Sequence, residues 1–232
     1  MTGLENWIEK IMPNVVENWS GDTGFIQSTK DTIYMTFWTS VIAGVIGLAL
    51  GVLLVLTDDH GLWESRPAYF ILDKLVNIFR AIPFIILLAV LDPVTRALVG
   101  IGIGPTAALV PLVAGTAPFF ARQVQNALLT IDPGVVEAAE AMGLSPLAIV
   151  WRVYLREGLS ELVRVGVLTI ISVIGLTAMA GAIGSGGLGN LAIQIGYNGF
   201  KNDVIWVATI LILIMVFIVQ FVGDIIAKKL HH

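Results

Sequence analysis

The chain has 232 residues, of which 56% are hydrophobic and 13% are charged, and its formal net charge is −4. Soluble domains carry about 25% charged residues, so a chain this apolar would aggregate in water, and we expect the lipid bilayer to be its solvent. The absence of cysteine excludes disulfides, thiolate metal sites and cysteine nucleophiles, and the lack of a basic excess argues against nucleic acid as a partner.

Residues 1–30 are predicted to form an external or interfacial arm. Pro13 is expected to interrupt a helix in this arm near its middle. The tryptophans on the apolar face favour a helix lying in the membrane interface, and a short arm packed on the bundle is the alternative. No cleavable signal peptide is visible, so the first span is expected to act as its own insertion signal. Apolar residues recur here at helical spacing, at Leu4, Trp7, Ile8, Ile11, Val15 and Trp19.

Five later stretches are apolar and long enough to cross the hydrocarbon core, which takes about 20 residues as a helix. The second stretch carries Asp73, Lys74 and Arg80 in its first half and the kink-forming Pro83 after them. We therefore predict an all-α integral membrane fold over residues 31–230. Its spans lie at about 32–56, 71–91, 105–128, 159–182 and 204–226.

The distribution of lysine and arginine predicts the orientation of these spans. An odd number of spans puts the two termini on opposite sides, and basic residues concentrate on the cytoplasmic side. With the N-terminus outside and the C-terminus in the cytoplasm, four of the 13 basic residues fall outside, namely Lys10, Lys30, Arg96 and Lys201. The other nine then lie on the cytoplasmic side, and Arg122 and Arg164 among them are expected to be interfacial anchors.

A stripe of small residues, Ala43, Gly47 and Gly51, recurs every four positions in the first span. Such a stripe lets helices pack closely in lipid, and packing within the subunit is favoured over packing between subunits.

The segment 132–157 carries two helix-start signals on what the charges predict is the cytoplasmic side. Asp132 can cap a helix that begins at Pro133 and runs to Met142, and Gly143 supplies the left-handed residue that ends it. Ser145 and the proline after it repeat the start signal, and the second helix continues through Trp151 and Tyr154 into the fourth span. We expect a helix–turn–helix along the membrane face that a soluble partner can grip.

Residues 137–155, EAAEAMGLSPLAIVWRVYL, resemble the EAA loop of bacterial ABC-importer permeases, the coupling segment that docks into an ATPase. Val153 and Leu155 fit the pattern loosely, and Arg156 stands where that family usually has proline. An ordinary amphipathic loop is the alternative. The candidate coupling residues are Glu137, Ala138, Ala139, Met142, Gly143 and Leu144.

A wider resemblance starts near Val76. The chain is similar there to the methionine-importer branch of these permeases, over residues 76–88, 117–122, 180–189 and 220–224 and over the EAA region. The resemblance implies a homodimer of five-helix subunits in the bacterial cytoplasmic membrane. It also implies two cytoplasmic ATPase subunits that hold ATP and magnesium, and an external lipoprotein that delivers methionine. It implies no cofactor in this chain.

The glycine-rich segment 184–189 does not predict nucleotide binding. Gly184-x-Gly186-x-x-Gly189 matches the dinucleotide fingerprint as a string, but the fingerprint requires a preceding strand, and a membrane helix precedes it here. A tight external turn, also containing Gly187, is the better interpretation, either as a contact for the delivery protein or as a simple compact turn. No G-x-x-x-x-G-K-[ST] occurs, so the chain is not expected to hydrolyse ATP itself.

The fourth span is rich in small residues and contains Thr177, Ala178 and Met179. Together with Pro83 these are the candidate residues of a translocation path, and Met179 is the candidate gate, because apolar side chains can close a pore to water. The alternative is that Met179 fills a packing gap.

No catalytic constellation is visible. His60 stands alone, since His231 and His232 end the chain and are consistent with a tag remnant, so no metal site is predicted. The sequence predicts a non-enzymatic permease subunit of an ATP-driven importer for methionine or a close amino-acid relative, working by alternating access. A permease for another small solute, a passive channel and a membrane scaffold are the alternatives.

Overall fold

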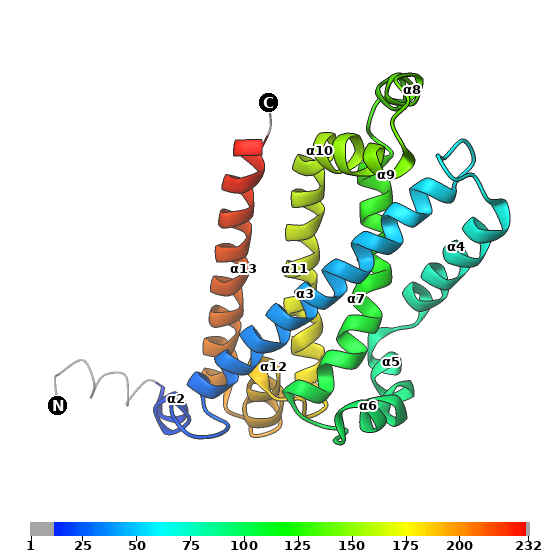
Figure 1. The fold of residues 1–232 in the computed structure, drawn as a ribbon. Coiled ribbons are helices and arrows are strands. Elements are labelled where there is room, and N and C mark those ends of the chain that lie inside the picture. The colour runs from blue at the N-terminus through cyan, green and yellow to red at the C-terminus, as the bar shows by residue number, and fades with distance from the viewer. Residues whose placement is uncertain (1–11, 231–232) are drawn as a thin grey trace. The chain divides into compact units, whose positions relative to one another are not determined.

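The computed structural model describes residues 12–230, and their regular elements are all helical (Figure 1). The predicted all-α fold is thus confirmed for the described residues. The predicted helix residues Leu4, Trp7, Ile8 and Ile11 lie outside them, as do the terminal histidines. The elements are α2 (Pro13–Glu17), α3 (Phe25–Thr57), α4 (Arg66–Ala81), α5 (Phe84–Val90), α6 (Asp92–Val99), α7 (Pro105–Leu128), α8 (Pro133–Ala141), α9 (Pro146–Ile149), the π-helical turn η1 (Val150–Tyr154), α10 (Leu155–Glu157), α11 (Leu159–Ala182), α12 (Gly187–Asn190), the π-helical turn η2 (Leu191–Tyr197) and α13 (Asn202–Leu230).

Four of the described helices, α3, α7, α11 and α13, are long and apolar enough to cross a membrane. The bounds of α7 and α11 coincide with the predicted stretches 105–128 and 159–182. The other two are longer than predicted, since α3 begins at Phe25 and α13 continues to Leu230. The beginning of α3 includes polar residues such as Lys30, because the backbone hydrogen bonds of a helix can continue beyond its apolar residues.

The second predicted stretch, 71–91, is not one helix. The helix α4 ends at Ala81, Ile82 has the extended backbone angles φ −77° and ψ 122°, and α5 begins only at Phe84. Pro83 causes this break, because proline lacks an amide hydrogen and disfavours the helical conformation of the residue before it. The expected kink is therefore a complete interruption.

The described residues form two compact units. The first unit contains residues up to Thr39, together with Phe84–Leu112 and Ile171–Ile218. The second unit contains Ser40–Pro83, Val113–Ile170 and the residues from Val219 onward.

In the first unit, α2 packs against the start of α13. Pro13 begins α2, and Met12 before it has the non-helical backbone angles φ −132° and ψ 59°. The residues before Met12, where the predicted helix would begin, lie outside the described part of the chain, so the prediction for Pro13 stays a prediction. The amide of Asn14 donates to Asp203 Oδ2 at 3.0 Å, and Lys201 Nζ lies 3.1 Å from Glu17 Oε2. Val15 is buried in a cluster with Phe25, Leu188, Leu191, Val204 and Ala208. The described part of the arm thus packs against the start of α13, and its position in the membrane interface stays a prediction.

In the second unit, α3 and α7 pack closely through the predicted stripe of small residues. Ala43 is fully buried, and a β-carbon added at Gly47 would lie 2.8 Å from the carbonyl oxygen of Ala117. One added at Gly51 would lie 2.6 Å from the carbonyl oxygen of Ala121. The prediction that this stripe serves packing within the subunit is confirmed.

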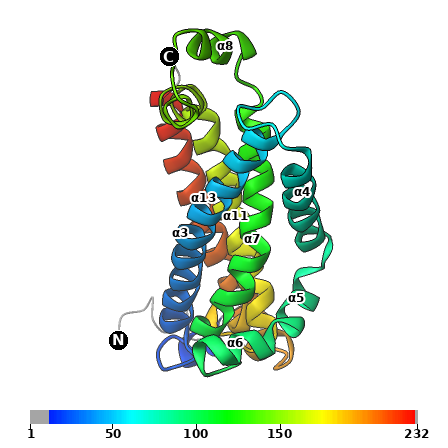
Figure 2. The ribbon, with the colours of Figure 1, turned by 45° about the vertical axis from the view of Figure 1, so that its right-hand side comes forward.

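An ion pair joins α4 to α7 in the same unit, where the two helices run side by side (Figure 2). Arg122 Nη2 donates to Asp73 and to Asn77, and Arg122 Nη1 donates to Gln125. The side chains of Arg122 and Asp73 are only 17% and 19% exposed. Arg122 is therefore not an interfacial anchor, because its charge is neutralised inside the unit. The Arg164 side chain is 54% exposed and its Nη1 lies 3.7 Å from Glu161 Oε2, as suits a residue at a helix end.

Candidate functional site

The helix α8 lies at one end of the second unit, farther from the long helices than α9 and α10 (Figures 1 and 2). Its boundaries follow from local chemistry. The Asp132 side chain accepts a hydrogen bond from the Gly134 amide at 2.8 Å, and Pro133 occupies the first turn. Gly143 has φ +80°, the left-handed conformation that glycine adopts without strain, just after the capping residue Met142. The predicted start of this helix is confirmed, and the helix ends at Ala141, one residue before the predicted Met142.

The candidate coupling residues divide between two faces of α8. Ala139 is 2% exposed and belongs to the core cluster of the second unit, against which Val136 and Leu144 also pack. On the other face, Val135 is 44% exposed and Met142 is 73% exposed, and Glu137, Ala138 and Gly143 are also exposed. The inward residues hold α8 in place, and the outward ones are available to a partner. Sequence reasoning did not separate the two groups.

The second half of the loop begins at Ser145, whose hydroxyl accepts from the Ala148 amide at 3.4 Å. The helix that was predicted to continue into the fourth span passes through η1 and α10 and turns at Gly158 before α11. Trp151 is 71% exposed, whereas Tyr154 is buried in the core cluster. Burial, with a smaller contribution from the Glu140 carboxylate, raises the pKa of Tyr154, so this phenol is neutral beneath α8.

A cavity of about 240 Å³ separates part of α8 from the turn that follows α3. Glu137 and Glu140 of α8 line one side, and Asp58, Asp59 and His60 line the other. This side of the loop is consequently acidic. Among residues 12–230, no group of three or more histidine, cysteine or carboxylate side chains is arranged to hold a metal ion.

The candidate path residues have different environments. Met179 on α11 is 41% exposed, whereas Thr177 is buried and its hydroxyl donates to the carbonyl of Ile174 at 2.7 Å. Ala178 is half-buried, and Pro83 is exposed. Pro83 belongs to the second unit and Met179 to the first, so neither unit by itself brings them together.

The glycine-rich loop after α11 is a tight turn. Gly184, Gly186 and Gly187 have φ between +79° and +96°. A β-carbon on Gly189 would collide with the backbone of Ala178, and the hydroxyl of Thr32 accepts from the Leu188 amide at 2.9 Å. The loop follows the helix α11 and not a strand, which agrees with the rejection of a dinucleotide site.

Residues 47–232 match the family described as the binding-protein-dependent transport system inner membrane component. The chain belongs to this family. It is 46% identical over 205 residues to the probable D-methionine transport system permease protein of Pasteurella multocida, covering 88% of this chain and 94% of that protein. It is also 47% identical over 222 residues to the methionine import system permease protein of Bacillus subtilis, covering 95% of this chain and 97% of that one.

Solved structures agree with the membership of this permease family. An inward-facing structure of the MetNI methionine ABC transporter, in its native crystal form, has a chain that matches with a TM-score of 0.88 and 40% identity, with complete coverage of both chains. A chain of an amino acid ABC transporter with histidines matches with a TM-score of 0.73 at 16% identity, which shows a shared fold only. The protein is therefore an integral inner-membrane permease component and not a catalytic subunit.

Proposed function

We propose that this chain is the permease subunit of an ATP-driven ABC importer that carries methionine, or a close amino-acid relative, into the cytoplasm. The observation that carries the proposal is the identity of 46% and 47%, over 88% and 95% of the chain, to permeases that are named for methionine transport. Alternating access by rigid-body rocking would move the substrate across the membrane.

The proposed assembly contains two copies of this chain and two cytoplasmic ATPase subunits that bind ATP and magnesium, with an external lipoprotein that delivers the substrate. We place the N-terminus outside and the C-terminus in the cytoplasm, which is supported by the excess of basic residues on the resulting inner side. Each subunit would have five spans, with α4 and α5 together forming a discontinuous second one. The coupling loop 132–157 then faces the ATPase.

Within this assembly we assign coupling to the exposed face of α8. ATP binding would draw the two ATPase subunits together, and each would carry an α8 with it. Val135, Ala138 and Met142 form an outward apolar stripe at the spacing expected for a helix that docks in a groove. Ala139 and Leu144 would transmit the movement, because they pack into the core of the second unit.

Ala138→Trp should abolish most of the association with the ATPase. The alanine is exposed, so the larger side chain fits the isolated permease but fills the space that a partner must occupy. We expect affinity for the ATPase to fall about tenfold or more, with membrane insertion and thermal unfolding unchanged. Quantitative co-purification measures the first, and a thermal unfolding scan measures the second.

Glu64→Trp is the matched control, because Glu64 is exposed between α3 and α4, on the same predicted side of the membrane but outside the coupling loop 132–157. It should leave the association unchanged. If Ala138→Trp also binds the ATPase with unchanged affinity, α8 is not the docking element.

Met179→Ala should make the transporter leaky. If Met179 forms the proposed gate, removing its half-exposed apolar side chain would admit water to the path, so methionine should cross without ATP. We expect passive efflux of labelled methionine from proteoliposomes to rise several-fold, and Met179→Leu, which restores the apolar volume, should keep the barrier. If Met179→Ala changes neither the leak nor the transport rate, Met179 only fills space.

The proposed function as a whole is tested by uptake in liposomes that contain this chain, the ATPase and the delivery protein. Uptake of labelled methionine should require ATP and stop when the ATPase is omitted. Flux that persists without the ATPase would indicate a passive channel, and ATP-driven uptake of another solute alone would change the assigned substrate.

A further inference from the structure

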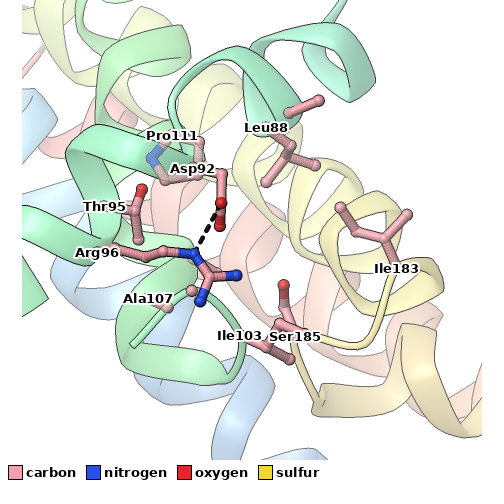
Figure 3. Close-up of a pocket in the computed structure, with 12 residues that line it drawn as sticks. Leu88, Asp92, Thr95, Arg96, Ile103, Ala107, Pro111, Ile183 and Ser185 are labelled. Carbon is pink, nitrogen blue, oxygen red and sulfur yellow. Dashed lines mark hydrogen bonds and ion pairs between the residues drawn. The ribbon is translucent and has the colours of Figure 1, made fainter. Parts of the chain in front are cut away.

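A cavity of about 360 Å³ in the first unit lies between α5, α6, the beginning of α7 and the loop after α11 (Figure 3). It is within the size range of small-molecule sites, which enclose about 300–1,000 Å³. The coupling and gating residues assigned above do not line it. Its lining combines charged, hydroxyl and apolar side chains, and each of these three kinds lies in a different part of the cavity wall.

One side of the cavity carries both signs of charge. Arg96 Nε donates to Asp92 Oδ2 at 2.8 Å, and the two side chains are 59% and 39% exposed. Neither Nη atom of Arg96 has a hydrogen-bond partner among the residues that the structure describes, and in Figure 3 the guanidinium extends toward the open centre of the cavity. A guanidinium in this state can still bind a carboxylate with two parallel hydrogen bonds.

Gly102 makes room for this pair. A β-carbon at residue 102 would lie 2.5 Å from Arg96 Nη2 and 2.5 Å from Asp92 Oδ1. Any larger residue would have to displace both charged groups. The pair is therefore held against the bare backbone of Gly102 and not merely placed on an open helix surface.

Two hydroxyl groups complete the polar part of the lining. Thr95 is 3% exposed, and its hydroxyl has no hydrogen-bond partner in the described part of the chain. Ser185 is 6% exposed, and its hydroxyl points toward the cavity from the side opposite Arg96 (Figure 3). The Thr95 hydroxyl is enclosed, with less than 1 Å² of exposed surface, so Ser185 supplies the hydroxyl that faces the cavity.

The remaining lining is apolar. Leu88 and Ile183 lie at the end of the cavity away from Arg96 (Figure 3). Ile183 is 47% exposed and Ile103 is 63% exposed, so both would gain from being covered by an apolar group. The cavity thus has an ion pair, with one positive and one negative group, at one end and solvent-exposed hydrophobic side chains at the other.

We propose that this cavity is a receiving site for a free α-amino acid with an apolar side chain. The ligand's ammonium group would bind Asp92, its carboxylate would bind the Nη atoms of Arg96 and the Ser185 hydroxyl, and its side chain would cover Ile183 and Ile103. The proposal deepens the function proposed above and rests on it. With the N-terminus outside, this site lies on the outer side, where an amino acid enters before it crosses.

Direct binding to the full-length permease in nanodiscs tests the site, with three probes at concentrations up to about 10 mM. The probes are methionine, 3-methylthiopropylamine, which lacks the carboxylate, and 4-methylthiobutanoate, which lacks the ammonium group. The wild type should prefer methionine to both analogues. Arg96→Gln should weaken methionine binding about tenfold or more and remove the preference over the amine. Asp92→Asn should remove the preference over the acid.

Gly102→Ala should also weaken methionine binding, while Gly175→Ala serves as its steric control, because Gly175 lies on α11 in the same unit, has no positive φ, and a β-carbon there would meet no atom within 4 Å. A thermal unfolding scan of each variant excludes loss of fold as the cause. No methionine binding to the wild type, or unchanged binding in both charge variants, overturns the proposal. So does a result in which the variants lose only their affinity for the delivery protein.

ATP-driven uptake by the complete transporter separates this proposal from the function on which it rests. If the wild-type complex imports methionine but its permease does not bind methionine in the cavity around Arg96, the receiving site is refuted and the proposed function is kept. Binding that follows the predicted pattern in a complex that imports only a different apolar amino acid would keep the site and change the transported substrate.

Discussion

Gly51→Ala should destabilise the permease by about 1–3 kcal/mol, the usual cost of overpacking a well-packed contact. The new methyl group would lie 2.6 Å from the Ala121 carbonyl oxygen and from two carbon atoms of Val124. Backbone atoms of α7 cannot rotate away as a side-chain tip can, so α3 and α7 must separate. The free energy of unfolding in detergent, measured by denaturant titration, checks the prediction.

Gly44→Ala is the matched control, because Gly44 lies in the same helix and a β-carbon there would meet no atom within 4 Å. Alanine is about 1 kcal/mol better than glycine inside a helix, so this variant should be neutral or slightly more stable. If both variants unfold alike, close approach of α3 and α7 is not what requires glycine at residue 51.

Arg122→Met should destabilise the second unit by about 2–3 kcal/mol, since the Asp73 side chain is 19% exposed and would keep only the more exposed Lys74, whose Nζ lies 3.9 Å from Asp73 Oδ2, as a cationic partner. Arg122 also donates to Asn77 and Gln125, and both lose that hydrogen bond. The double variant Asp73→Leu with Arg122→Met should recover much of the loss, because it removes both charges together. A double-mutant cycle of unfolding free energies measures the coupling between the two positions.

The exposed pair of Arg66 and Asp59 serves as the reference for that cycle. Their side chains are 81% and 62% exposed, so the same double replacement should change stability by no more than about 0.5 kcal/mol. If the changes in unfolding free energy caused by the Asp73 and Arg122 substitutions simply add in the double variant, water and not the ion pair satisfies these two charges.

The elements that the sequence predicted best are those whose ends are fixed by local chemistry. The helix α8 has a capping aspartate and a proline at its start and a left-handed glycine after its end, so one or two neighbouring residues determine each boundary. The break at Ile82 was predicted only as a kink, because a proline inside an apolar stretch can bend a helix or end it, and packing decides between them. The burial of Arg122 could not be read locally, since its partner Asp73 lies 49 residues away.

The candidate sites show the same division. The pattern of Glu137, Ala138 and Ala139 identified the coupling loop, but the burial of Ala139 depends on the core beneath α8. The cavity around Arg96 was missed. Its only local signal is an aspartate four residues before an arginine, which is common on helix surfaces. What makes that pair distinctive is the placement of Gly102 and Ser185 beside it, and Ser185 reaches this place only because the loop after α11, which is distant in the sequence, folds against α6.

The interruption between α4 and α5 has a consequence for hydration. A helix leaves its last four carbonyl groups and its first four amides without partners inside the helix, and Pro83 has no amide to offer. Hydrocarbon tails cannot satisfy these groups, and such backbone is tolerated at membrane depth only against protein or beside water. If α4 and α5 together form the proposed second span, the stretch around Ile82 is therefore sheltered from the acyl chains in the assembled transporter. A polarity-sensitive dye attached at residue 82 should report an environment of water or protein and not of hydrocarbon.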